Sequence, residues 1–241
     1  MRIIKSVRKA FARAALLKKS GSFLRRIWRK VSYEVSQRLF WAFGDKYKGK
    51  TTLVSFYTCD WRYPEYAENL RRECLRLHMP HRIEELQSTG SYLKNTCLKP
   101  TFIRDKLREI KGPVLWVDCD GSLLRPPVFF DGLTCDFAAK KMPKGRARTW
   151  HVGTMWFNYN DTVLHFLDRW IENSGEISDE SALERTWRQI QLDAVDIPSD
   201  YFVILRANRM PHGVICHRIS DGEVKLRELP LAIEKAKKGI L

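Results

Sequence analysis

The strongest constraint on the fold is a continuous apolar run, VLWV at residues 114–117, that leads directly into Asp118 and Asp120. Four apolar residues in succession are typical of a parallel strand that is covered on both faces. Strand-like and helix-like segments alternate around this run, which indicates an α/β protein with a doubly wound, mainly parallel sheet. Ligands of such sheets bind beyond the carboxyl ends of the strands, and the two aspartates stand at one such end.

The segments on either side of the run give the alternation in detail. β-branched and aromatic content predicts strands at 51–59, 81–86, 113–118, 128–141, 150–158, 202–207 and 213–220. Apolar residues at three- and four-residue steps predict helices at 64–77, 99–110, 161–173 and 178–190. Pro100 suits the first turn of the second helix, and Ser178 is the expected N-cap of the last.

Charge divides the chain into an arm and a body. Residues 1–50 contain fifteen Lys and Arg against two acids, whereas the rest carries 28 basic and 26 acidic residues. Apolar residues recur at helical spacing between the arm's charges, which predicts a basic amphipathic helical arm at 1–50. Residues 51–241 form the predicted catalytic body.

Composition restricts the compartment and the protein class. Hydrophobic residues make up 44% of the chain, so it can bury a core. No run reaches the 18 or so apolar residues of a spanning helix. The six cysteines show no zinc-type spacing and are expected to be reduced, mostly buried thiols of a cytoplasmic protein. A secretory signal is not expected, and an Arg-rich organelle transit peptide stays open as an alternative.

Two unrelated kinds of active site contain an Asp-x-Asp motif after a strand. DCDGSLL matches the signature of phosphatases that resemble the haloacid dehalogenases, in which the first aspartate is the nucleophile. Those enzymes need further carboxylates after a later strand to hold magnesium, and this chain offers no such pair. Their motif also lies on the first strand, whereas a β–α unit and a further helix precede it here. The second chemistry, a metal-holding pair, therefore fits better.

The body resembles glycosyltransferases of GT-A type, in particular the small nucleotide-diphospho-sugar transferases common in bacteriophage and bacterial genomes. The matching segments, in order, are SFYTCD, LKPTFIRDKL, VLWVDCDGSLLRPP, HVGTMWFN, SDESAL and VICHRIS. One departure is Gly121, where that family more often has a small or aliphatic residue. The resemblance implies a GT-A-like domain that transfers a sugar from a nucleotide-diphosphate sugar, with UDP as the expected nucleotide, to a hydroxyl.

The same resemblance implies a metal site. A divalent cation, Mn²⁺ or Mg²⁺, held by carboxylates can neutralise a diphosphate leaving group. Asp118 and Asp120 would supply oxygen ligands, and His217 would be the third ligand from a distant strand.

The other implied roles concern the donor and the acceptor. Tyr57 and Thr58 would hold the base, and Lys99 and Arg104 would face the ribose and diphosphate. Gly153 and Thr154 would let donor or acceptor approach the backbone closely. Asp179 or Glu180 would orient the acceptor hydroxyl or act as the base. Each residue also has a structural interpretation, as a turn, a core side chain or a solvated helix charge.

The acceptor follows from the basic arm, for which three interpretations stay open. The arm could bind an anionic membrane surface, which would suit a glycolipid acceptor. It could bind DNA phosphates, which would suit a nucleic-acid acceptor. In the third interpretation the apolar faces of the arm pack on the body. DNA is favoured because phage-type relatives are thought to glycosylate hydroxymethylated pyrimidines. The basic loop at 141–149 would be a second phosphate contact, and Trp61, Trp150 or Trp156 could stack in place of a flipped base. A phosphatase and a nucleic-acid-binding module with a vestigial site are the remaining alternatives.

Overall fold

The computed structural model describes residues 45–59, 62–143, 145–175, 177–205 and 212–218. Most of the predicted basic arm, residues 1–44, lies outside this range. Two residues near the end of that arm contact the body: Lys46 Nζ donates to the carbonyl of Arg76 at 2.8 Å, and the amide of Tyr47 donates to the carbonyl of Leu77 at 2.7 Å. The Tyr47 hydroxyl donates to the carboxylate of Asp131.

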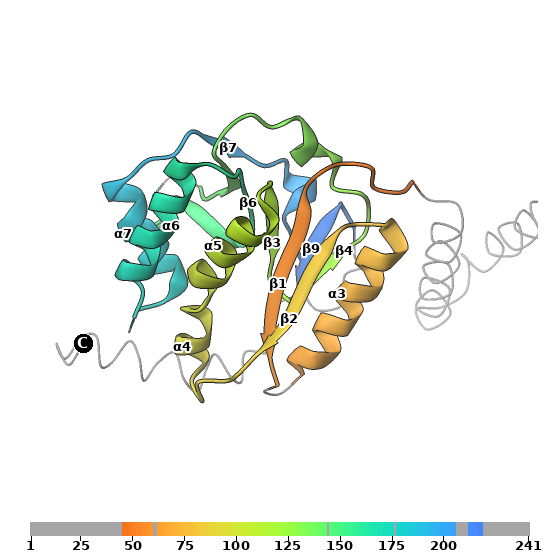
Figure 1. Cartoon of the computed structure of the whole chain (residues 1–241), viewed down its shortest axis with the longest axis horizontal. Coiled ribbons are helices and arrows are strands. Elements are labelled where there is room, and N and C mark those ends of the chain that lie inside the picture. The colour runs from red at the N-terminus through yellow and green to blue at the C-terminus, as the bar shows by residue number, and fades with distance from the viewer. Residues whose placement is uncertain (1–44, 60–61, 144, 176, 206–211, 219–241) are drawn as a thin grey trace, which may run out of the picture. The chain divides into compact units, whose positions relative to one another are not determined.

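A six-stranded sheet forms the centre of the body (Figure 1). Its strands, in spatial order, are β2 His81–Leu86, β1 Thr52–Thr58, β3 Val114–Val117, β6 Trp150–Phe157, β5 Phe137–Lys141 and β7 Ala194–Asp196. β1 is parallel to β2 and β3, β7 is parallel to β5, and β6 is antiparallel to both of its neighbours. The α/β class and the mainly parallel sheet are therefore confirmed, with β6 as the reversed strand.

Helices lie on both sides of this sheet. Figure 1 places α5 Lys99–Ile110, α6 Asp161–Asn173 and α7 Asp179–Gln189 on one side of β1. It places α3 Tyr63–Leu77 on the other side, with a second sheet of β4 Gly121–Leu123, β9 Ile215–Arg218 and β8 Val203–Leu205. Coverage on both sides explains why β3 is fully buried and uniformly apolar.

The core between the sheet and α5 is aromatic. Phe56 of β1 contacts Phe102 of α5 and Trp116 of β3, with ring centroids 5.4 Å apart in both pairs. These rings belong to a larger cluster that includes Leu107 of α5 and Leu167 of α6. The aromatic packing fixes the position of α5 against the carboxyl ends of β1 and β3, and so fixes the first turn of α5 beside Asp118.

Most predicted elements are present, with instructive exceptions. α7 begins as expected, with the Ser178 side chain accepting from the Ser181 amide. The segment 128–141 was expected to be strand throughout, but Val128–Gly132 is a short 3-10 helix, η2, and only Phe137–Lys141 is a strand. The prediction missed the short elements α4 Tyr92–Thr96, β4 and β7, because three to five residues carry too little periodicity. A second 3-10 helix, η3, spans Ser199–Tyr201.

Candidate functional site

The Asp118–Asp120 pair lies at the carboxyl end of β3, where the chain leaves the central sheet. The amide of Asp118 donates to the carbonyl of Gly153 at 3.0 Å, and the amide of Gly121 donates to the carbonyl of Asp118 at 2.7 Å. A Cβ on Gly121 would lie 2.6 Å from a methyl of Val117 and 2.9 Å from the Asp118 carbonyl oxygen. Only glycine fits this tight turn, which explains the departure at position 121.

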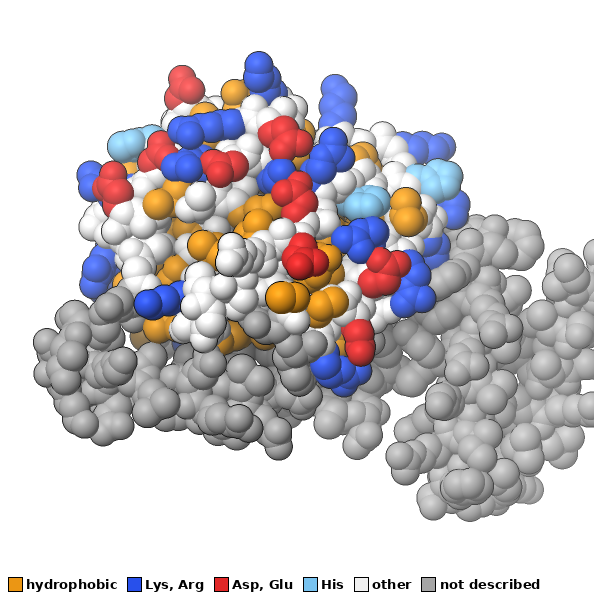
Figure 2. All heavy atoms as spheres, turned by 60° about the horizontal axis from the view of Figure 1, so that its bottom comes forward, with side chains coloured by type: hydrophobic (Ala, Val, Ile, Leu, Met, Phe, Trp, Pro, Cys, Tyr) orange, Lys and Arg blue, Asp and Glu red, His pale blue; other side chains and the backbone are white. Residues whose placement is uncertain are grey.

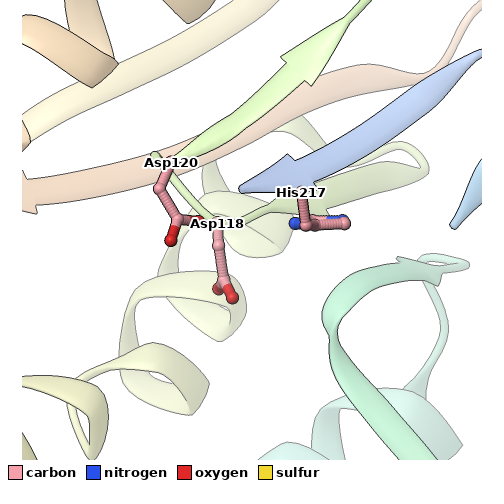
Figure 3. A group of neighbouring side chains, drawn as sticks. All are labelled: Asp118, Asp120 and His217. Atoms are coloured by element: carbon pink, nitrogen blue, oxygen red, sulfur yellow. The ribbon is translucent and has the colours of Figure 1, made fainter. Parts of the chain in front are cut away.

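β4 and β9 bring the third predicted ligand to the pair. Gly121 is paired directly with His217 in the antiparallel register of these strands. One candidate ligand atom each from Asp118, Asp120 and His217 lie within 4.8 Å of one another. Figure 3 shows the two carboxylates and the imidazole side by side, with one ring nitrogen on the side of Asp118. The three predicted ligands, separated by almost a hundred residues, are thus brought together.

The donor set suits a hard or borderline divalent cation. Burial lowers the pKa of His217 to about 4, so the imidazole is neutral at pH 7 and a ring nitrogen can be a ligand. Two carboxylates with one imidazole form a donor set that can hold a divalent cation. Gly153 leaves the space open, since a Cβ there would lie 3.3 Å from Asp118 Oδ2 and from Cε1 of His217.

A buried lysine links this cluster to the start of α7. Lys99, in the first turn of α5, is only 4% exposed. Its Nζ lies 3.0 Å from Asp118 Oδ1 and 2.6 Å from Asp179 Oδ2. Burial alone would lower the pKa of Lys99, but the carboxylates of Asp118 and Asp179 raise it above its ordinary value. Lys99 is therefore a charged bridge between the two aspartates.

The surroundings of Asp118 keep it ionised and leave one oxygen open. Burial opposes ionisation, but the nearby charge of Lys99 and the hydrogen bond from its ammonium lower the pKa of Asp118 below its ordinary value. Oδ1 accepts from Trp116 Nε1 at 2.9 Å as well as contacting Lys99. Oδ2 is thus the Asp118 atom that can face a metal.

A cavity of about 270 Å³ opens beside the acidic pair. Its aromatic lining comes from Phe56, Tyr57, Tyr63, Tyr92 and Trp116, and its polar lining includes Thr58, Asn95, Lys99, Asp118, Asp120, His151, Asp179 and Glu180. This edge of the sheet faces the viewer in Figure 2, where hydrophobic and acidic side chains gather near the middle with Lys and Arg side chains around them. Its size and its mixture of aromatic and polar walls suit a small polar ligand with planar parts.

The predicted site residues fall into three groups. Tyr57, Thr58, Lys99, Asp179 and Glu180 line the cavity with the acidic pair.

Gly153 and Thr154 form a second group, which lies behind the acidic cluster. Thr154 is fully buried, and its Oγ1 lies 2.6 Å from His217 Nε2. The side chain of Thr154 therefore faces His217, and the close approach of donor or acceptor to the backbone at Gly153 and Thr154 stays a prediction.

Arg104 stands apart from the cluster. It lies in α5 beyond Lys99, and its Nη1 is 2.9 Å from Asp168 Oδ1 while its Nη2 is 3.0 Å from Asp105 Oδ1. It does not line the cavity, because its direction around the helix points it to α6. This position of Arg104 fits the structural interpretation, a solvated helix charge.

Three residues that line the cavity have no sequence pattern around them that would have identified them as site residues. Tyr63 opens α3, Tyr92 lies in the unpredicted α4, and His151 lies in β6. Burial raises the pKa of both tyrosines, so their hydroxyls stay protonated and can donate. His151 Nδ1 accepts from the Gly153 amide at 3.1 Å, and its ring packs on Phe202 at 4.1 Å between centroids. A histidine within an apolar strand pattern is usually interpreted as a core residue, and for that reason the sequence did not indicate His151 as a site residue.

Comparisons with known proteins identify the fold. Scans of the sequence against protein-family models and against curated proteins find no match. Among solved structures, a glycosyltransferase involved in glycosylation of the major capsid of PBCV-1 is 11% identical, with 76% of this chain and 98% of that one covered at a TM-score of 0.57.

The apo form of the glycosyltransferase GlyE of Streptococcus pneumoniae TIGR4 is also similar. It is 14% identical, 80% of this chain and 64% of that one are covered, and the TM-score is 0.51. The chain therefore has a GT-A-type glycosyltransferase fold, as the resemblance of its motifs implied. In the part of the chain that the structure describes, no helix combines the length and apolarity needed to cross a membrane.

Proposed function

We propose that the protein is a metal-dependent glycosyltransferase that takes a sugar from a nucleotide-diphosphate sugar. The observation that carries this proposal is the juxtaposition of Asp118, Asp120 and His217 in a GT-A-type fold, with the two aspartates lining the cavity. A divalent cation bound there would neutralise the negative charge that develops on the diphosphate leaving group. We expect Mn²⁺ or Mg²⁺, with UDP as the nucleotide.

The chain's own residues divide the remaining work. We assign the contact with the nucleotide to Tyr57 and Thr58, which line the cavity at the carboxyl end of β1. Lys99 supplies a fixed positive charge beside the acidic pair. Its ammonium also holds Asp179, whose other oxygen, Oδ1, accepts from the Glu180 amide at 2.9 Å. Asp179 is thereby oriented through both oxygens.

Glu180 is then the better candidate to act on the acceptor. Its carboxylate lines the cavity and pairs with Arg148 of the basic loop. That pair is partly exposed, so an incoming hydroxyl can replace the guanidinium as hydrogen-bond partner at modest cost. We assign to Glu180 the orientation of the acceptor hydroxyl, and the acceptance of its proton if the sugar is attacked directly.

The function is tested with the full chain, Mn²⁺ and a panel of nucleotide sugars. We expect release of a nucleoside diphosphate from one member of the panel, and loss of that release when EDTA removes the metal. Inorganic phosphate released from phosphate esters, with no reaction of sugar nucleotides, would instead support the phosphatase alternative. No product from either substrate class would support the third alternative, a nucleic-acid-binding module with a vestigial site.

The acceptor we propose is DNA that carries hydroxymethylated pyrimidines. The support among described residues is the exposed basic loop, with Lys141, Arg146 and Arg148, which joins the cavity through the Arg148–Glu180 pair. Two of the tryptophans considered for stacking on a flipped base are excluded: Trp150 and Trp156 are buried in the core, at 6% and 2% exposure. Trp61 lies outside the described residues.

Salt dependence separates DNA from a membrane acceptor. If the loop and the arm contact phosphates, duplex binding weakens steeply with salt, with a slope near −0.9 for each phosphate neutralised. Replacing Arg146 by Ala would reduce that slope by about 1. The measurement is fluorescence anisotropy across a salt series, beside sedimentation with anionic liposomes. Liposome binding without DNA binding would favour the glycolipid acceptor instead.

Gly153 offers a test of the metal centre that leaves every ligand in place. In Gly153→Ala the new methyl would lie 3.3 Å from Asp118 Oδ2, His151 Nδ1 and His217 Cε1. We expect the methyl to crowd the metal position and to weaken Mn²⁺ binding about tenfold, with the melting temperature little changed. Isothermal titration with Mn²⁺ measures this. Gly132→Ala is the matched control, because nothing lies within 4 Å of a Cβ there. Equal affinity in the two variants would contradict the proposed metal position.

A further inference from the structure

The contact between Thr154 and His217 is buried and polar, and no donor or acceptor molecule could reach it. Thr154 is fully buried on β6, and its Oγ1 lies 2.6 Å from His217 Nε2. Two strand registers create this contact: Thr154 is paired with Val117, the residue before Asp118, and His217 is paired with Gly121, the residue after Asp120. The hydroxyl and the imidazole therefore meet directly behind the acidic pair.

A histidine can be a ligand through either ring nitrogen, and the contact with Thr154 distinguishes the two. Nε2 is engaged by the threonine hydroxyl, which leaves Nδ1 as the ring nitrogen available to a metal. If Nδ1 is to be a ligand it must be unprotonated, so the neutral ring carries its hydrogen on Nε2. That N–H can donate to Thr154 Oγ1, the arrangement by which partners of metal-bound histidines set the tautomer.

We propose that Thr154 is the positioning residue of the metal centre: its hydroxyl oxygen accepts the Nε2–H of His217 and thereby directs Nδ1 of that ring toward Asp118 and Asp120. This inference rests on the proposed function, since it requires the metal centre to exist. It gives the Thr154 side chain a role different from the close backbone approach of donor or acceptor that the resemblance implied.

The other neighbours of the imidazole confine it but do not choose its orientation. A Cβ on Gly121 or Gly153 would lie 3.4 or 3.3 Å from His217 Cε1, so the ring fits closely between two backbone segments. The ring of Phe202 covers it at 4.9 Å between centroids. These contacts are apolar or steric, and a half-turn of the ring, which exchanges Nδ1 with Cδ2, would preserve much of them. The threonine hydroxyl is the partner that tells the two orientations apart.

Metal affinity in the absence of sugar nucleotide tests the proposal directly. Mutations of such hydrogen-bond partners typically cost about 10- to 100-fold in metal affinity. We expect Thr154→Val to weaken Mn²⁺ binding at least about tenfold, and Thr154→Ser, which keeps the hydroxyl, to bind as the wild type does. In a His217→Ala background, Thr154→Val should cause no further loss, because there is no ring left to orient. Thr186→Val is the matched control, at another fully buried threonine, whose hydroxyl donates to the Ala182 carbonyl of α7 and accepts from Asn173 of α6.

The outcomes separate this inference from the proposed function. Thr154→Val with wild-type affinity, beside a weakened His217→Ala, would overturn the role of Thr154 and leave the metal centre intact. A wild-type protein that binds no Mn²⁺ would overturn both. Loss of affinity in Thr154→Val that persists in the His217→Ala background would also overturn it, because the effect would then not pass through the imidazole.

A second measurement needs no variant that must fold. Nitrogen-15 NMR of histidine-labelled, metal-free wild-type protein reports which ring nitrogen carries the hydrogen. We expect His217 to be in the Nε2–H form, with Nδ1 unprotonated. A hydrogen on Nδ1 would overturn the proposal whatever the variants do.

Discussion

Asp118→Asn is expected to reduce nucleoside diphosphate release by about 100- to 1000-fold at saturating Mn²⁺. The substitution keeps the shape of the side chain but removes the charge that a divalent cation needs. Charge stabilisation by a bound metal is worth several kcal/mol in the transition state, and each 1.36 kcal/mol corresponds to a factor of ten in rate. Because Asp118 Oδ2 is the oxygen open to the metal position, its loss should remove most of that stabilisation.

The measurement is the initial rate of diphosphate release, paired with Mn²⁺ titration of the same sample. Asp168→Asn is the matched control, because Asp168 makes partly exposed ion pairs with Arg104 and Arg108 and does not line the cavity. We expect it to retain full rate and full Mn²⁺ affinity. If Asp118→Asn releases diphosphate as fast as Asp168→Asn, the acidic pair is not the metal centre of the reaction.

The acidic pair could be predicted from sequence because its signal is local. An apolar strand followed by Asp-x-Asp needs only a few neighbouring residues, and both aspartates lie where that pattern puts them, at the carboxyl end of β3. His217 could be named only through the resemblance. Its place beside the pair depends on the register of β4 with β9, and β4 is a three-residue strand that periodicity does not show.

Side-chain direction explains most of the remaining differences. Lys99 and Arg104 are both basic residues of α5, yet Lys99 is buried against two aspartates while Arg104 turns to Asp168 of α6. Helical periodicity predicts that the two side chains point in different directions, but not which segments pack against each of them. The segment beside Arg104 is α6, which is distant in sequence. The burial of Thr154 also depends on a segment that is distant in sequence. His217, in β9 of the second sheet, contacts the Thr154 side chain on β6.

The largest expected effect on stability comes from Lys99. Lys99→Met would leave Asp118 and Asp179 facing each other without their shared counter-charge, in a place where the lysine is 4% exposed. Breaking a buried ion pair by removing one partner costs about 3–5 kcal/mol. For a chain of this size that is a fall in melting temperature of roughly 10 °C. Differential scanning calorimetry with EDTA present measures it.

A control on the same helix separates burial from charge. Arg104→Met removes two partly exposed ion pairs, with Asp105 and Asp168, so it should cost only about 1 kcal/mol. Equal melting temperatures for Lys99→Met and Arg104→Met would contradict the role of Lys99 as a buried bridge. Adding Asp179→Asn to Lys99→Met should recover part of the loss, because one of the two uncompensated carboxylates is then neutral.

Mn²⁺ should stabilise Lys99→Met more than it stabilises the wild type. A bound divalent cation stabilises the folded state by mass action, in proportion to the logarithm of its concentration over its Kd. Without Lys99 the same cation also supplies the positive charge that Asp118 lacks, so the rise in melting temperature on adding Mn²⁺ should be larger in the variant. An equal or smaller rise would mean that Lys99 and the metal do not share Asp118. A larger rise would show that the carboxylate of Asp118 interacts both with Lys99, which stabilises the fold, and with the metal of the proposed reaction.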